Sequence, residues 1–192
     1  MLMRWSVLFV PVCLAIVGGC SAYVDNFYYR PRPGIVEIPP PTTREAPPVT
    51  GFASVIGVRN EDRSANLPPS IEVRVRIENN SGGPVGFDPR TLELIDGSLV
   101  KVPPPIVRPD ERITLQPKES LALSAFFPFP PGHTWHNTDL ESLQLRWLVD
   151  VNGRTDGLAV NFHRVAYVYH DPYWYGGPPV FYGGFVYVHH HR

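Results

Sequence analysis

The sequence predicts an all-β protein, an antiparallel sandwich of about seven to eight strands. The chain has 23 Pro and 16 Gly among 192 residues, which excludes long helices over most of its length. Apolar and polar side chains alternate along several segments, as they do in strands with one face in a core and one in water. Turn-forming residues separate these segments at short intervals, and no window carries the continuous apolar stripe of a helix.

The strands are expected between residues 51 and 168. The first lies near residues 53–58, and the clearest follows it and ends at turn-forming residues 79–83. Four apolar residues of that second strand alternate with charged ones: Ile71, Val73, Val75 and Ile77 against Glu72, Arg74, Arg76 and Glu78. Asp96-Gly97 predicts a hairpin turn, and Pro117 closes a short strand. The apolar residues of these middle strands are Leu92, Leu94, Leu99, Val102, Ile113, Leu115, Leu121, Leu123, Ala125 and Phe127.

The longest apolar stripe comes late in the chain. It comprises Leu143, Leu145, Trp147, Val149 and Val151, and Asn152-Gly153 turns it back into a strand with Leu158, Val160 and Phe162. Trp147 is the expected centre of the core. This number of strands in ~120 residues is the size of an immunoglobulin-like sandwich, although a small barrel would show similar alternation.

Three segments of this region resemble the immunoglobulin-like accessory domains of secreted bacterial proteins. They read IEVRVRIENNSG, FDPRTLELIDG and LQPKESLALSAFFPFP. In such domains a strand ending in Asn precedes a Leu-Asp-Gly hairpin, and a Leu-x-Pro-x-Glu turn leads into a strand ending in Phe-x-Pro. The resemblance implies a binding or spacing role and carries no catalytic residue.

The N-terminus combines a positive charge, a short apolar run and a cysteine after small residues. Arg4 supplies the positive charge, residues 5–17 form an apolar run too short to span a bilayer, and residues 17–20 read Val-Gly-Gly-Cys. The last motif resembles the lipobox of bacterial lipoproteins. It implies a signal peptide over residues 1–19 and palmitate or similar acyl chains on Cys20, which would anchor the protein in the cell envelope. Ser21 after the Cys favours the outer membrane, facing the periplasm or the exterior. An ordinary secretory signal is the alternative.

Residues 20–50 follow as a Pro-rich linker. Its prolines disfavour helix and sheet and favour polyproline II, which predicts a disordered stalk or leader that holds the domain off the membrane.

The C-terminal tail, residues 169–192, is rich in aromatic residues, Gly and His. Imidazoles suit divalent transition metals, so His189, His190 and His191 with His170 are the candidate ligands of a weak metal site. The rigid aromatic side chains could bind a glycan or another envelope protein. The candidates are Tyr173, Trp174, Tyr175, Phe181 and Tyr182.

Other features narrow the function. Only Cys13 and Cys20 occur, so a mature chain would have no free thiol or disulfide, and 17 basic against 18 acidic residues argue against a nucleic-acid partner. His133-x-x-His136 near Asp139 and Glu141, and a calcium-like loop from Asp150, are interpreted as a solvated loop and a hairpin. The sequence has no catalytic motif. We therefore expect a non-enzymatic lipoprotein with a structural or binding role, or alternatively one that binds metal or a small ligand through its tail.

Overall fold

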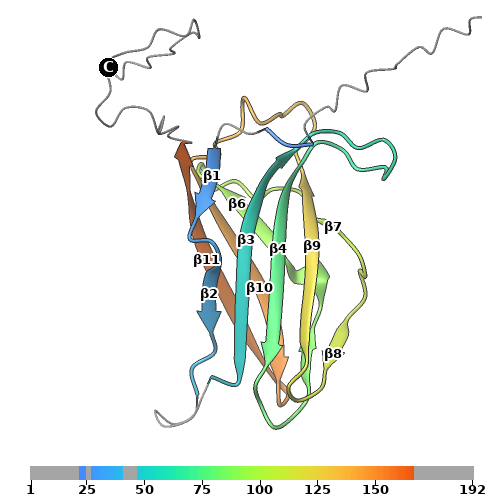
Figure 1. The fold of residues 1–192 in the computed structure, drawn as a ribbon, viewed down its shortest axis with the longest axis vertical. Coiled ribbons are helices and arrows are strands. Elements are labelled where there is room, and N and C mark those ends of the chain that lie inside the picture. The colour runs from blue at the N-terminus through green and yellow to red at the C-terminus, as the bar shows by residue number, and fades with distance from the viewer. Residues whose placement is uncertain (1–21, 25–26, 41–46, 167–192) are drawn as a thin grey trace, which may run out of the picture.

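The computed structural model describes residues 22–24, 27–40 and 47–166. Two antiparallel sheets pack face to face, which confirms the predicted all-β sandwich (Figure 1). The five-stranded sheet has the order β2 (Gly34–Glu37), β3 (Val49–Arg59), β4 (Ser70–Asn79), β9 (Ser120–Pro128) and β7 (Ile106–Val107). The six-stranded sheet has the order β1 (Phe27–Arg30), β11 (Arg154–Ala166), β10 (Ser142–Val151), β5 (Val85–Phe87) and β8 (Ile113–Leu115), with β6 (Glu93–Asp96) also paired to β10.

Helix is nearly absent from the described residues. They contain the single 3-10 turn η1 (Pro89–Thr91), which begins after Asp88, whose carboxylate accepts a hydrogen bond from the Arg90 backbone N–H. Within the described part of the chain, no helix is long and apolar enough to cross a membrane.

The described residues form eleven strands, more than the seven to eight predicted. The additional strands include β5 and β7, which have three and two residues. Strands this short contain at most one or two alternations, and β5 and β7 were not distinguished from loops.

The prediction of a disordered stalk is wrong for residues 27–37. Here β1 pairs with β11 in one sheet, and β2 pairs with β3 in the other. Tyr29 is buried at 1% exposure, and its hydroxyl donates to the Leu140 carbonyl at 2.9 Å. Pro31 and Pro33 lie between the two strands, at a point where no backbone N–H is needed for pairing. Both strands lie at sheet edges, which tolerate nearby prolines, so the sandwich begins well before residue 51.

The core lies between the two sheets, where the sequence placed it. The inward residues of β4 and of the predicted late stripe are buried, and Trp147 is 1% exposed at the centre. The ring of Trp147 lies against β3 at Gly51, where a Cβ would come within 2.7 Å of its Cζ2. A larger residue at position 51 would therefore clash with the indole, and glycine leaves the space that the indole occupies.

The two ends of the sandwich differ in what they carry. The upper end in Figure 1 holds loops 60–69 and 129–141 and the hairpin tip at residues 97–100. Both chain ends of the described part lie there, because the Tyr23 backbone bridges Arg59 at the end of β3, and Phe27 pairs with Ala166 at the end of β11. The lower end holds the turns at residues 80–84, 116–119 and 152–153.

Candidate functional site

The site residues predicted from the sequence lie outside the described residues. This applies to Cys20, to the candidate metal ligands His170, His189, His190 and His191, and to the aromatic candidates Tyr173, Trp174, Tyr175, Phe181 and Tyr182. These candidates therefore stay predictions. The structure does describe residues 22–24, where the N-terminal side of the chain meets the fold.

The histidine loop at residues 133–136 falls within the described residues. His133 and His136 are exposed, and the ring of His136 lies 3.5 Å from that of Trp135, centroid to centroid. In the described part of the chain, no group of three or more His, Cys, Asp or Glu side chains is placed to hold a metal ion. The segment from Asp150 is a hairpin, since Asp150 pairs with Thr155 across the turn at Asn152-Gly153.

The N-terminal junction, residues 22–24 against the end of β3, joins the predicted anchor to the sandwich. The Val24 N–H donates to the Val58 carbonyl at 2.9 Å, and the Asn60 N–H donates to the Ala22 carbonyl at 3.0 Å. These residues thus extend β3's pairing by one short antiparallel bridge. Two peptide units separate Cys20 from Ala22, so their Cα atoms are at most about 7–8 Å apart.

The side chain of Tyr23 in this junction covers a buried carboxylate. The Tyr23 hydroxyl donates to Glu72 Oε2 at 2.6 Å, and the Ser124 hydroxyl donates to Glu72 Oε1 at 3.2 Å. Arg59 Nη1 lies 3.6 Å from Glu72 Oε2. We call Tyr23, Arg59, Glu72 and Ser124 the Glu72 cluster; it joins the junction to β3, β4 and β9.

Burial makes the Glu72 cluster unusual for the solvent-facing side of a sheet. Glu72 itself is 3% exposed although its neighbours on the same face, Arg74 and Arg76, are exposed. Burial, together with the hydrogen bond to Glu72, raises the pKa of Tyr23. The sequence showed Glu72 only as one more polar residue of an alternating strand, so this function as an anchor point for the N-terminal segment was missed.

A bulge in β3 prepares this arrangement. The pairing with β4 shifts between Val55 and Gly57, which leaves Ile56 as the extra residue. Gly57 has φ of +155°, and a Cβ there would lie 3.4 Å from Tyr23 Cδ1. Gly57 therefore supplies the backbone conformation of the bulge, whereas a Cβ there would make only an ordinary contact with the Tyr23 ring.

Arg59 also fixes loop 60–69 through Asp62. Arg59 Nη2 lies 2.7 Å from Asp62 Oδ2, while Asp62 Oδ1 accepts from the Ser64 hydroxyl and from the Ser64 and Ala65 backbone N–H groups. The hydrogen bonds from Ser64, Arg59 and Ala65 lower the pKa of Asp62 to about 2, from an ordinary 3.8.

We expect Asp62→Asn to lower stability at neutral pH and to flatten the acid dependence. A carboxylate whose folded pKa is depressed stabilises the fold above its unfolded pKa of 3.8, and this contribution is lost as the pH falls from about 4 to about 2. Urea midpoints at pH 7, 4 and 2 measure the effect. The gap between wild type and variant should be constant down to pH 4 and close toward pH 2; a gap independent of pH would contradict the role of Asp62.

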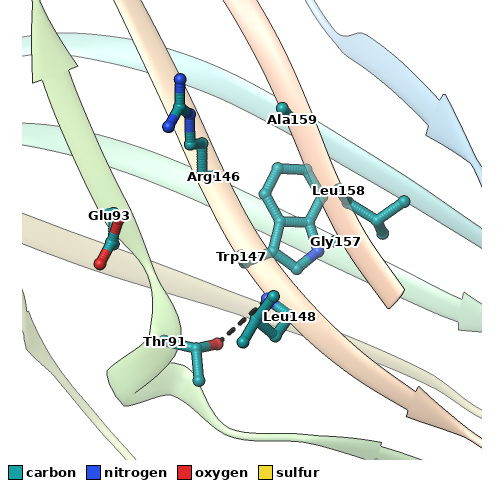
Figure 2. A pocket seen from close by; sticks show the side chains of 8 residues that line it. All are labelled: Thr91, Glu93, Arg146, Trp147, Leu148, Gly157, Leu158 and Ala159. Atoms are coloured by element: carbon teal, nitrogen blue, oxygen red, sulfur yellow. Dashed lines mark hydrogen bonds between the residues drawn. The ribbon is translucent and has the colours of Figure 1, made fainter. Parts of the chain in front are cut away.

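A groove of about 480 Å³ lies on the solvent face of the six-stranded sheet (Figure 2). Thr91 and Glu93 form one wall, β11 with Gly157 and Ala159 forms the other, and Arg146 and Leu148 of β10 lie between them. The groove exists because Gly157 and Ala159 have small side chains and because η1 interrupts the pairing of β10 between β5 and β6. Thr91 Oγ1 accepts the Leu148 N–H at 3.2 Å in place of a strand partner.

The groove combines an exposed apolar floor with charged side chains that are held by other partners. Leu148 is 46% exposed and offers an apolar floor. Glu93 binds Lys101 at 2.5 Å, and Arg146 Nε donates to Gln144 at 2.5 Å, so the two charged residues are held apart by other partners. A second hollow, of about 750 Å³, lies at the lower end beside Pro48, Asn152 and Arg154.

No family model and no curated relative matches the chain. Among solved structures, the FixG-related protein from Vibrio parahaemolyticus is 13% identical with a TM-score of 0.39, over 62% of this chain and 97% of that one. The yjhA protein from Bacillus subtilis is also 13% identical with a TM-score of 0.34, over 50% of this chain and 71% of that one. Both likenesses are too distant to say anything of function.

Proposed function

We propose that this protein is an acylated lipoprotein of the bacterial envelope with a non-enzymatic structural or binding role. The Val-Gly-Gly-Cys motif at residues 17–20 supports the anchor. The observation that carries the proposal furthest is the N-terminal junction, because two hydrogen bonds and the Glu72 cluster tie residues 22–24 to the sandwich immediately after Cys20. Through these contacts, the predicted anchor would be connected directly to β3 and β4.

This junction implies a short tether instead of a long stalk. With acyl chains on Cys20, the upper end of the sandwich lies next to the headgroups, since Ala22 already belongs to the fold. The lower end is then displayed about 35 Å away, given the eleven residues of β3 at ~3.3 Å each. The groove and the lower hollow both lie on surfaces that this orientation leaves open to a partner.

The charged groups support a non-enzymatic role. The Glu72 cluster and Asp62 hold the N-terminal segment and a loop, and Asp88 caps η1. Arg90 lowers the pKa of Asp88 through the hydrogen bonds between their side chains. Each perturbed group in this set thus has a structural partner that accounts for it. Metal or ligand binding through residues 169–192 is the alternative function, and it rests on the sequence alone.

Replacing Cys20 tests the anchor. In cells fed labelled palmitate, we expect the wild-type protein and a Ser21→Ala control to carry the label and to fractionate with the outer membrane. Cys20→Ser should carry none, because it removes the sulfur that is acylated. Equal labelling of the Cys20→Ser protein, or no labelling of the wild type, would contradict the proposal.

A further inference from the structure

An exposed apolar hairpin tip follows β6. Leu99 is 85% exposed and Val100 is 54% exposed, which makes the pair unlike the buried apolar residues on either side, Leu94 and Val102. Leu99 has φ of +62°, a left-handed conformation that Gly or Asn usually occupies. A leucine that contributes almost nothing to packing, in a conformation that costs free energy, suggests a role outside the fold.

The tip is firmly held despite its exposure. The Leu99 N–H donates to the Asp96 carbonyl at 3.0 Å, and the Asp96 N–H donates to the Val100 carbonyl at 3.0 Å. The Val100 N–H donates to Asp96 Oδ1 at 2.8 Å. A rigid tip presents its apolar side chains without first having to lose conformational entropy.

The position of the tip relates it to the predicted anchor. The Gly97 N–H donates to the Asp139 carbonyl at 3.0 Å, which attaches the tip to loop 129–141. The same loop is attached to the end of β11, since the Arg164 N–H donates to the Glu141 carbonyl at 2.8 Å. The tip therefore belongs to the upper end of the sandwich. Ala22, which follows Cys20 by two residues, lies at the same end, where its carbonyl accepts from the Asn60 N–H.

The polar side chains around the tip have hydrogen-bond or ion-pair partners within the protein. Asp96 is occupied by the Val100 N–H, and Asp139 Oδ1 accepts from the Glu141 N–H at 3.0 Å. Lys101 is paired with Glu93. The half-buried Trp135 lies in loop 129–141 at the same end, and indoles favour the membrane interface.

We propose that the Leu99–Val100 tip inserts into the interface of the lipid bilayer and fixes the tilt of the sandwich on the membrane. This inference rests on the proposed function, because acylation at Cys20 is what brings the upper end to the lipid. The lipid surface, and not a protein partner, is the occupant, since the chain enters the fold at this end directly after the predicted anchor.

The experiment uses single cysteines in the acylated, full-length protein. Acylation occupies the sulfur of Cys20, so Leu99→Cys supplies a unique thiol for a fluorophore. Leu148→Cys is the matched control, another exposed leucine but one in the middle of a sheet. In phosphatidylethanolamine–phosphatidylglycerol vesicles with brominated acyl chains, we expect quenching at position 99 to exceed that at position 148 about threefold or more, because inserted apolar groups reach the acyl boundary.

Mass spectrometry of the purified protein distinguishes a failure of the proposed function from a failure of this inference alone. If Cys20 carries no acyl group, the proposed function and this inference both fall. If Cys20 is acylated and the two positions are quenched equally, the insertion of the tip alone is overturned. As a folding control, Leu99→Gly should leave the thermal midpoint unchanged or raise it, since glycine adopts positive φ freely; a lower midpoint would assign Leu99 a packing role and overturn the inference.

Discussion

Trp147→Ala should destabilise the protein by about 3–5 kcal/mol, the largest effect that we expect from one substitution. The indole is 1% exposed at the centre of the core and faces Gly51 and Leu158. Removing it leaves a cavity that two paired sheets cannot close, because their backbones are fixed by hydrogen bonds on both sides. Urea unfolding followed by far-UV circular dichroism measures the loss.

Two further variants make this expectation specific. Trp147→Phe should cost less, because the buried indole N–H has no acceptor among the described residues and no hydrogen bond is lost with it. Trp135→Ala is the matched control, since Trp135 is half-buried in a loop, and it should cost only about 1 kcal/mol. An equal loss at positions 135 and 147 would contradict the central place of Trp147.

Glu72→Ala should cost about 2–4 kcal/mol and release the N-terminal segment. The substitution leaves the Tyr23 hydroxyl and the Ser124 hydroxyl without their acceptor, and Arg59 without one of its two carboxylates. Because Arg59 keeps Asp62, the effect should stay below that of a fully unpaired buried charge. Urea unfolding gives the global cost, and amide exchange at Val24 reports the local release.

Glu78→Ala is the control for this substitution. Glu78 lies on the same face of β4 and pairs with Arg76 at 2.5 Å, but both side chains are partly exposed. Surface ion pairs of this kind contribute about 0–1 kcal/mol, so the control should hardly change stability or exchange at Val24. If the two glutamate variants behave alike, the Glu72 cluster does not hold the N-terminal segment.

The sequence predicted those strands that are long enough to repeat the alternation of apolar and polar side chains several times. The alternation in β4 and β10 identified the inward faces and Trp147, because burial of one face forces period two on a strand. The same reasoning failed for β1 and β2. In β1, the buried Phe27 and Tyr29 alternate with less buried residues as a strand should, but the surrounding prolines dominated the interpretation. Edge position, which sequence does not reveal, is what makes those prolines compatible with the sheets.

The candidate site was predictable only in part. The Val-Gly-Gly-Cys motif predicts acylation of Cys20 from local sequence alone, because a processing signal is read in an extended chain before folding, and it stays a prediction. The Glu72 cluster could not be found in this way, because its four residues are distant in sequence. They meet only through the pairing of β3, β4 and β9 and the bridge of Tyr23 to Arg59. The groove depends in the same way on which strand lies beside Gly157 and Ala159.

The most direct test is amide hydrogen exchange at Val24 and Asn60 in the full-length protein. In the structure, residues 22–24 are part of the sandwich: the Val24 N–H donates to the Val58 carbonyl, and the Asn60 N–H donates to the Ala22 carbonyl. Both amides should then exchange at least about a hundredfold more slowly than in an unstructured peptide. Exchange at the unstructured rate would mean that residues 22–24 are not held by the sandwich, and would contradict the proposed short tether.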